Sequence, residues 1–334
     1  MLANTFSIAI CSFNPDLRAL NRLLNAIIAL RSVNEVSSIL IVDNCSVPPL
    51  SSVEFVQKFL NLLPQARCVI ETTPGQTAAR CRAILETASD VIIFFDDDNE
   101  PNCDYLVILD DAFTRYPSVG IWQPGSIKVE FLDDASPLIR QRPQIYQERS
   151  DLFSYGCHLN WDKLSRIHGT GFAVRRKILL RFVNQYKSCA LAYLSRTGNS
   201  LASSEDLQIV WEAYSLGFAA GTLPSLHCNH LIIGRKSTEE YARRLHFWSA
   251  AAAYLALLES FPDAAIDVPQ SRLILRLFLN YLSMLFYALV RRQQSFDRDL
   301  RWGAILGQSF GLAKSAQPDL AHLIRKIAEI QGYW

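Results

Sequence analysis

Residues 91–98 of the chain are Val91-Ile-Ile-Phe-Phe-Asp-Asp-Asp98, five apolar residues followed directly by three carboxylates. An apolar run of this length that ends abruptly in polar residues is typical of a strand buried on both faces of a parallel sheet. Two earlier runs have the same form: residues 7–13 and residues 39–42, the latter followed by Asp43. In an open α/β sheet, ligands bind beyond the carboxyl ends of the strands. We therefore expect the three polar strand ends to converge on one crevice.

Helical periodicity fills the intervals between these runs. After the first run, apolar residues recur three and four positions apart, as at Leu20, Leu23 and Ile27, which is typical of one buried helix face. Strands that alternate with helices predict an α/β fold with a mostly parallel, Rossmann-like central sheet flanked by helices.

The strand pattern stops before the last third of the chain. Residues 133–162 form a polar stretch with few apolar anchors, and we expect a long irregular excursion there. Beyond it, helical patterns cover residues 238–260, 271–292, 298–314 and 318–331. The sequence thus predicts an α/β domain over residues 1–235 and a C-terminal helical region over residues 236–334.

Composition excludes several classes of protein. The chain has 334 residues, 50% hydrophobic and 19% charged, which excludes a disordered chain, a coiled coil and a small disulfide scaffold. Lys and Arg number 33 against 32 Asp and Glu, and this balance argues against a nucleic-acid partner. The eight cysteines show no C-x-x-C spacing, which predicts reduced thiols. The first residues read as a strand rather than a signal peptide, so we expect a cytoplasmic location.

The three consecutive carboxylates are the clearest chemical signal. Asp96, Asp97 and Asp98 repel one another when held close together, and a divalent cation removes that repulsion. Hard oxygen ligands at one or two positions suit Mg²⁺ or Mn²⁺, which also bridge substrate phosphates. The alternative is an acidic turn that is simply solvated.

Three further segments have both a functional and an ordinary interpretation. Arg80 lies one turn into a helix after Pro74-Gly75 and suits a phosphate, although a solvated arginine is equally ordinary. Ser204-Glu205-Asp206 begins a helix, where capping is the simpler interpretation and a general base the functional one. His230, with Arg235 beyond it, suits a metal or a diphosphate as well as a structural histidine.

Taken in order, these segments resemble the family 2 glycosyltransferases, which have the GT-A fold. The resemblance covers about residues 5–250. The matching segments are Ile8-Ala-Ile-Cys-Ser-Phe-Asn-Pro15, Ile39-Leu-Ile-Val-Asp-Asn-Cys-Ser46, Pro74-Gly-Gln-Thr-Ala-Ala-Arg80, Phe95-Asp-Asp-Asp-Asn99, Gly169-Thr-Gly-Phe-Ala-Val-Arg-Arg176, Ser204-Glu-Asp-Leu207 and His230-Leu-Ile-Ile-Gly-Arg235. Two departures are Cys81, where similar sequences commonly have asparagine, and Ser12-Phe13-Asn14 in place of Thr-Tyr-Asn.

The resemblance implies a role for each matching residue. The residues implied to bind the nucleotide sugar are Ser12, Phe13, Asn14, Asp43, Gly75, Arg80, Asp96 and Asp97. Those implied to hold the metal are Asp96 and Asp98 of the DXD motif, together with His230. Gly169 and Gly171 would border the acceptor, Asp206 would be the catalytic base with Glu205 beside it, and Arg235 would contact the diphosphate.

These roles imply a metal-dependent, inverting glycosyltransferase that uses Mn²⁺ or Mg²⁺. The donor would be a nucleotide-diphosphate sugar, with UDP favoured over GDP or dTDP. The acceptor would be a saccharide or lipid-linked hydroxyl in polysaccharide or glycolipid biosynthesis. One alternative is a sugar-1-phosphate nucleotidylyltransferase, but residues 12–15 are not the glycine-rich basic loop that it needs after the first strand. The other is a non-catalytic subunit that binds a nucleotide sugar.

The helical region leaves two interpretations open. Residues 273–290 are the most apolar stretch, but Arg276, Asn280 and Ser283 interrupt it, and a spanning helix needs about 20 apolar residues. A transmembrane span is therefore not expected. The stretch is either a bundle helix that packs on the α/β domain or a second subunit, or an interfacial helix on the cytoplasmic face of a membrane. The following arginines suit an anionic surface or water equally, and they are Arg291, Arg292, Arg298 and Arg301.

Overall fold

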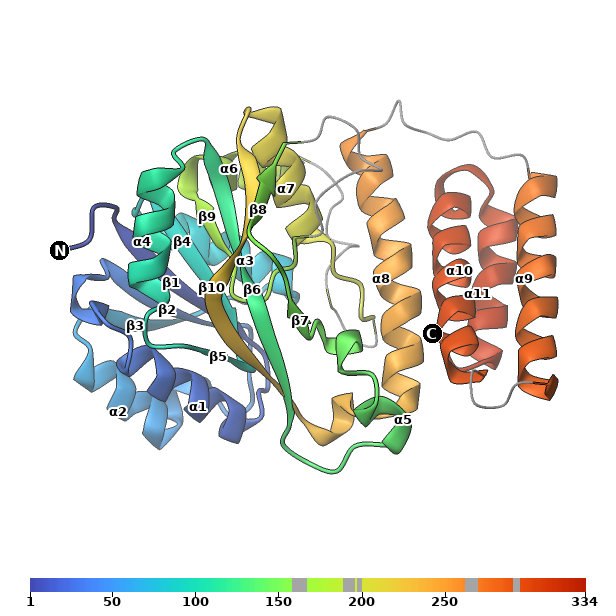
Figure 1. Cartoon of the computed structure of the whole chain (residues 1–334), viewed down its shortest axis with the longest axis horizontal. Coiled ribbons are helices and arrows are strands. Elements are labelled where there is room, and N and C mark those ends of the chain that lie inside the picture. Colours follow the sequence, from blue (N-terminus) through green and yellow to red (C-terminus); the bar gives the residue numbers. More distant parts are fainter. Residues whose placement is uncertain (158–166, 189–195, 197–199, 262–269, 291–294) are drawn as a thin grey trace. The chain divides into compact units, whose positions relative to one another are not determined.

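The computed structural model describes residues 1–157, 167–188, 196, 200–261, 270–290 and 295–334 (Figure 1). The chain divides into two compact units, and we describe each by itself. The first consists of Met1–Leu132, Pro143–Ala192 and Asp206–Ile233. The second consists of Asp133–Arg142, Tyr193–Glu205 and Gly234–Trp334.

A ten-stranded, mostly parallel sheet organises the first unit. Its main path runs β3-β2-β1-β4-β9-β6-β10-β5, with β7 beside β6 and β8 beside β10. The strands are β1 (Phe6–Ser12), β2 (Ser38–Asp43), β3 (Ala66–Ile70), β4 (Val91–Asp96), β5 (Asn99–Pro101), β6 (Val119–Phe131), β7 (Arg149–Ser150), β8 (Ser154–Gly156), β9 (Ala173–Arg175) and β10 (Ala219–Ile232). Strands β3, β2, β1 and β4 are parallel, as are β6 and β10, whereas β5, β7, β8 and β9 pair antiparallel.

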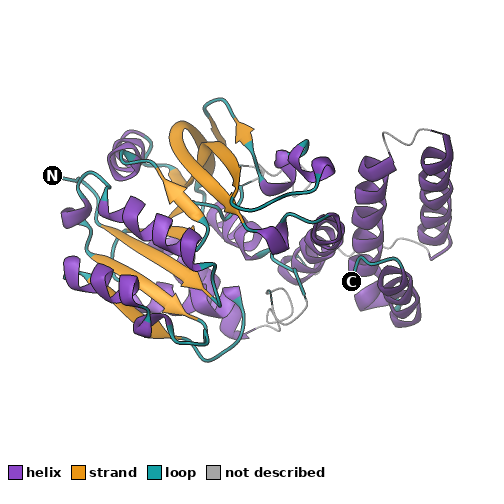
Figure 2. Cartoon of the chain, turned by 90° about the horizontal axis from the view of Figure 1, so that it is seen from below, coloured by secondary structure: helices purple, strands orange, loops and turns teal. Residues whose placement is uncertain are grey.

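Helices cover both faces of this sheet (Figure 2). Successive side chains of a strand point to opposite faces, so Ile8 and Ile10 of β1 join one apolar core and Ala9 joins the other. The first core includes α1 (Leu17–Ile28), α2 (Glu54–Leu62) and α4 (Tyr105–Arg115). The second includes α3 (Gln76–Glu86), α6 (Arg176–Ser188) and α7 (Glu205–Ser215). Because both faces are buried, the central strands need the continuous apolar runs seen in the sequence.

The position of β1 brings the polar strand ends together. β1 lies between β2 and β4, so the chain order reverses at this strand. In the parallel register Ser12 is opposite Asp43, and Cys11 is opposite Asp96. The crevice beyond such a reversal is where open α/β sheets bind ligands.

The second unit is helical within the described residues. Its helices are α5 (Pro137–Arg140), α8 (Glu239–Ser260), α9 (Gln270–Val290), α10 (Ser295–Ala316) and α11 (Pro318–Ile330). Helices α8 and α10 approach closely, because a Cβ at Gly307 would lie 2.1 Å from the carbonyl oxygen of Phe247. Only glycine permits such an approach of two backbones. Among the helices that the structure describes, none has the length and apolarity that crossing a bilayer requires.

Most elements match the sequence predictions, with three differences. β3 was not expected, because its residues are half-buried or exposed and form no long apolar run. β9 lies between Gly171 and α6, where a direct entry into a helix was expected. The polar stretch expected over residues 133–162 is not irregular as far as residue 157, since it forms α5, a 3₁₀ turn at Pro143–Tyr146 and the strands β7 and β8, and residues 158–162 lie outside the described residues. These short elements are held by long-range pairing, which leaves no local periodicity to detect.

Candidate functional site

Ser12 and Asp97 meet at the ends of β1 and β4. The Ser12 hydroxyl donates a hydrogen bond of 2.6 Å to Oδ2 of Asp97. Beyond Ser12, Phe13 is exposed and Asn14 has a positive φ of 44°, so the backbone turns sharply away from the strand. The ends of these two adjacent strands thus present two polar side chains, Ser12 and Asp97, with the exposed ring of Phe13 next to them in the sequence.

Asp43 organises the loop that follows β2. Its two carboxylate oxygens each accept a backbone N–H at 2.8 Å, one from Ser46 and one from Leu50. Asn14 ties into the same loop, because its side-chain oxygen accepts the N–H of Val47 at 2.8 Å. Asp43 is almost fully buried, with 1% of its surface exposed. In this structure its carboxylate fixes the shape of the loop after β2.

Asn44 connects that loop to the start of α3. Its amide nitrogen donates to the carbonyl oxygens of Glu71 and Thr73, and its oxygen accepts the N–H of Gly75 at 2.8 Å. Gly75 has a φ of 122°, which residues with a side chain rarely adopt. Asn44 was not among the candidate residues. Its position directly after a strand-end aspartate was the only signal available.

Arg80 is buried rather than exposed to a ligand. Its side chain is 2% exposed, its guanidinium carbon lies 5.2 Å from the centre of the Phe172 ring and 5.7 Å from that of Phe94, and Nη2 lies 3.3 Å from Oδ1 of Asp96. The same Asp96 oxygen accepts a 2.9 Å hydrogen bond from the side chain of Gln76. Arg80 therefore positions Asp96, whose carboxylate is half-buried.

Gly169 connects Arg80 with Asp206. A Cβ at position 169 would lie 2.9 Å from Nη2 of Arg80, so the glycine backbone rests directly on the guanidinium. The N–H of Gly169 donates to Oδ2 of Asp206 at 3.1 Å, and Oδ1 of Asp206 accepts the N–H of Leu207. The contacts Asp96–Arg80–Gly169–Asp206 thus join the end of β4 to the start of α7.

Gly171 of the first unit and Glu205 of the second unit each make a hydrogen bond within their own unit. Gly171 has a φ of 66°, and its carbonyl oxygen accepts a short hydrogen bond from the buried hydroxyl of Tyr105. A Cβ at position 171 would lie 2.6 Å from that hydroxyl. Glu205, 1% exposed, accepts the hydroxyl of Ser203 at 3.1 Å. The carboxylate of Glu205 is therefore buried, whereas Asp206 is half-buried.

Asp98 and His230 face each other across β5 and β10. Nε2 of His230 lies 3.6 Å from Oδ1 of Asp98, and the two side chains are 15% and 6% exposed. Nδ1 of His230 lies 2.8 Å from the carbonyl oxygen of Tyr146 and must donate to it, because a carbonyl only accepts. In the neutral imidazole this leaves a lone pair on Nε2, directed with the carboxylate oxygen into one space.

This pair fits a divalent cation, although the third predicted ligand lies elsewhere. A proton or a cation between two facing acceptors stabilises their approach, and a neutral imidazole with a carboxylate is a common metal-ligand combination. Asn99 supports the pair, since its amide donates to Oδ1 of Asp98 at 3.0 Å. Asp96 instead faces Arg80 and Gln76. Among the described residues no group of three or more His, Cys, Asp or Glu side chains is arranged to hold a metal.

The remaining basic candidate, Arg235, lies outside this cluster. Arg235 is exposed and lies in the 3₁₀ turn Gly234–Lys236 of the second unit, so the first unit's geometry does not include it.

Arg149 was not predicted, yet its guanidinium is buried, and this desolvation lowers its pKa. Nη2 of Arg149 and the N–H of His168 both donate at 2.9 Å to the side-chain oxygen of Gln123. Arg149 and the residue before Gly169 are thus held together through the same Gln123 oxygen.

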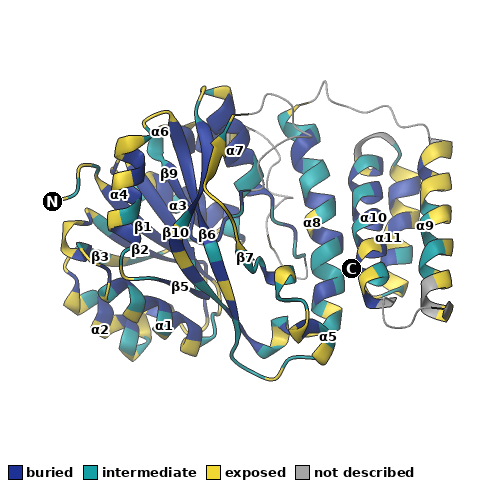
Figure 3. Cartoon of the chain, viewed as in Figure 1, coloured by how far each residue is buried: buried dark blue, intermediate teal, exposed yellow. Residues whose placement is uncertain are grey.

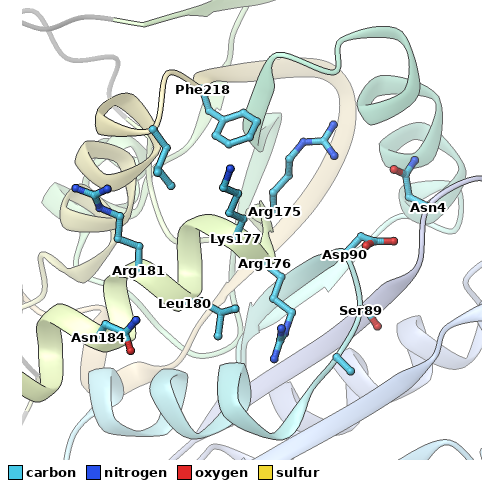
Figure 4. A pocket seen from close by; sticks show the side chains of 12 residues that line it. Asn4, Ser89, Asp90, Arg175, Arg176, Lys177, Leu180, Arg181, Asn184 and Phe218 are labelled. Carbon is cyan, nitrogen blue, oxygen red and sulfur yellow. The ribbon is translucent and has the colours of Figure 1, made fainter.

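One pocket of the first unit lies at the opposite ends of the strands, where β1 and β4 begin. It has a volume of about 680 Å³, and Asn4 and Asp90, which precede β1 and β4, line it (Figure 4). The arginines that line it are already paired with other groups of the protein. Arg175 and Arg176 donate to main-chain carbonyl oxygens, and Arg181 pairs with a glutamate at 2.6 Å. We therefore do not assign the donor to this pocket.

The fold is that of GT-A glycosyltransferases. A structure of GalNAc-T7 with UDP, GalNAc and Mn²⁺ is similar to the chain, with 13% identity and a TM-score of 0.52 over 80% of this chain and 52% of that chain. TarS of S. aureus, residues 1–349 in complex with UDP-GlcNAc, is similar with 14% identity and a TM-score of 0.50 over 98% and 89%. The chain thus spans about half the length of the GalNAc-T7 chain.

No curated protein sequence matches the chain. A family model described as glycosyl transferase family 2 matches residues 7–182, more than half of the chain. The chain therefore belongs to glycosyltransferase family 2, which confirms the resemblance, the fold class and the glycosyltransferase class that the sequence predicted.

Proposed function

We propose that the chain transfers a sugar from a nucleotide-diphosphate sugar to a hydroxyl acceptor, with a divalent cation and with inversion at the anomeric carbon. The observation that carries this proposal is the chain of contacts Asp96–Arg80–Gly169–Asp206. It connects the carboxylate of Asp96, at the carboxyl end of β4, to the carboxylate of Asp206, at the start of α7. Single displacement needs a base for the incoming hydroxyl at a fixed position relative to the donor.

The donor side would bind the nucleotide between the strand ends. The hydroxyl of Ser12 and the carboxylate of Asp97 offer hydrogen bonds to a ribose, and the exposed Phe13 ring offers an apolar surface to a base. Asp98 and His230 would hold the cation. When bound, Mn²⁺ or Mg²⁺ neutralises the charge that develops on the leaving diphosphate. UDP is the favoured nucleotide, because GalNAc-T7 and TarS, which share the fold, were crystallised with UDP or a UDP-sugar.

Asp206 would accept the proton of the acceptor hydroxyl. The N–H groups of Gly169 and Leu207 hold its carboxylate in one orientation, and the side chain is only half-buried, so an acceptor can reach it. Gly169 packs directly on Arg80 and leaves no space there for a side chain. Arg80 is buried, and we therefore assign it to positioning Asp96 rather than to contact with the diphosphate. The proposed acceptor remains a saccharide or a lipid-linked hydroxyl, on a polysaccharide or glycolipid pathway.

A donor screen tests the proposal. Nucleotide release is measured for UDP-, GDP- and dTDP-sugars with Mn²⁺ or Mg²⁺, with and without a chelator. We expect release from one nucleotide class, lost on chelation. Absence of release and of thermal stabilisation with every nucleotide would contradict the donor site. Nucleotide binding that chelation leaves unchanged would contradict the metal site.

The assignment of Asp206 has its own variant. In Asp206→Asn we expect unchanged affinity for the donor nucleotide and a loss of transfer of about 100-fold or more, since the amide accepts no proton. Donor binding is measured by calorimetry and transfer by product formation. Transfer at the wild-type rate would return Asp206 to a helix-capping role.

The cation site has a matched control on the same strand. His230→Ala removes the nitrogen that faces Asp98, whereas His227→Ala removes an exposed histidine of β10. We expect weaker Mn²⁺ binding by calorimetry only in the first variant, with both proteins folded. Equal Mn²⁺ affinity in the two variants would show that His230 is not a ligand.

A further inference from the structure

The face of α9 that points away from α10 is apolar and exposed (Figure 3). Eight large side chains on this helix are between 38% and 80% exposed: Ile274, Leu275, Phe278, Leu279, Leu282, Leu285, Phe286 and Leu289. At 3.6 residues per turn all eight fall within an arc of about 140°. We call this set the α9 apolar face.

A different face of α9 packs within the second unit. Leu273 is 2% exposed, and the Tyr281 ring lies 5.5 Å from the ring of Trp302 on α10. Arg276 donates to the side chain of Gln308 on α10 at 2.6 Å. One side of the helix thus packs on α10, and the residues of the α9 apolar face take no part in that packing.

The size of the α9 apolar face is unusual for a surface that remains in water. Its exposed fractions together equal about four fully exposed apolar residues, on the order of 800 Å². The largest apolar patch of a typical monomer is about 300–600 Å². A contiguous patch of this size marks a surface that another apolar phase or partner covers.

The charges of α9 indicate which partner covers it. The helix contains Arg272 and Arg276 and no Asp or Glu, and both arginines are exposed. On the helical wheel they lie beside one edge of the α9 apolar face. An apolar face bordered only by cations complements an anionic lipid surface, whereas α9 offers no carboxylate to pair with the arginines of a second copy.

We propose that the α9 apolar face lies in the interfacial region of an anionic membrane, with Arg272 and Arg276 at the headgroups. The helix would lie along the surface, in keeping with the absence of a spanning helix among those described. Binding combines burial of the apolar side chains with attraction of the arginines. The proposal does not depend on the proposed glycosyl transfer.

Sedimentation of the full chain with vesicles tests it. One vesicle contains equal amounts of phosphatidylglycerol and phosphatidylcholine, and the other contains phosphatidylcholine alone. We expect the wild-type chain to sediment with the first and, at low salt, several-fold more weakly with the second. The double variant Phe278→Glu/Leu282→Glu should bind at least about tenfold more weakly, and Arg272→Gln should lower binding to the anionic vesicle only.

The matched control is Leu323→Glu, which places the same charge at a 54% exposed leucine of α11. It should sediment like the wild type, and circular dichroism should show all variants folded. No sedimentation of the wild type, or equal binding by the double variant, would overturn the proposal. So would a lipid-free dimer, seen by analytical ultracentrifugation, that the double variant converts to a monomer.

Discussion

Replacing Gly169 by alanine tests the central chain of contacts with one methyl group. The added Cβ would lie 2.9 Å from Nη2 and 3.0 Å from Nη1 of Arg80. A guanidinium at the end of an exposed side chain would simply move. That of Arg80 is 2% exposed and lies beside the rings of Phe94 and Phe172, so it has no free space to enter.

The expected magnitude follows from this confinement. Overpacking a filled interior typically costs about 1–3 kcal/mol of stability. For a unit of this size that corresponds to a decrease in Tm of roughly 2–10 °C. Displacement of Arg80 also loosens Asp96, and movement of the Gly169 N–H removes a hydrogen bond from Asp206. Misplacement of two reacting groups should lower transfer about 10- to 100-fold.

The assay is a double-mutant cycle with Arg80→Lys, which removes both guanidinium nitrogens that meet the new methyl group. Thermal unfolding and transfer rates are measured for the wild type, both single variants and the double variant. We expect Gly169→Ala to cost less in the Arg80→Lys background, with a coupling energy above about 0.5 kcal/mol. Additive effects, or a Gly169→Ala protein with wild-type Tm and transfer, would refute the reasoning.

Two further predictions concern titratable groups away from this contact. Burial lowers the pKa of His246 on α8, so the unfolded chain binds its proton more readily, and this residue should cost stability as pH falls below about 6.5. Chemical denaturation over pH about 5 to 8 should show a shallower pH dependence for His246→Gln and no change for the exposed His322→Gln; equal slopes would contradict the assignment. Burial and nearby carboxylates raise the pKa of Cys228 to about 12, so a thiol reagent should leave it unmodified while it labels the exposed Cys45. Peptide mapping of the native chain checks this, and early labelling of Cys228 would show that the site opens.

Apolar periodicity was sufficient for most elements of the chain. The central strands are buried on both faces, so their sequences are continuous apolar runs, and the four C-terminal helices follow their 3.6-residue pattern. β3 escaped prediction because its exposed positions interrupt that pattern. β7 has only two residues and exists through its pairing with β6, which no local sequence signal encodes.

The sequence predicted a list of candidate residues and not the contacts between them. The matching segments indicated that Arg80, Asp96 and Asp206 belong to one site, and the first unit does place them in one chain of contacts. The sequence suggested that Arg80 reaches a phosphate, whereas the aromatic rings around it bury the guanidinium. The Phe94 ring belongs to β4, and the Phe172 ring belongs to a loop far along the chain. The sequence around Arg80 therefore contains no local pattern that reveals its burial.

The three aspartates at the end of β4 show most clearly what the sequence determines and what the tertiary structure determines. The sequence by itself determined that three carboxylates follow a buried strand, because an apolar run and its polar end are local properties. Only the tertiary structure decided that Asp96 faces Arg80, Asp97 accepts the hydroxyl of Ser12, and Asp98 faces His230. Consecutive side chains at a strand end point in different directions, and the partner that each one meets is set by the order of strands in the sheet.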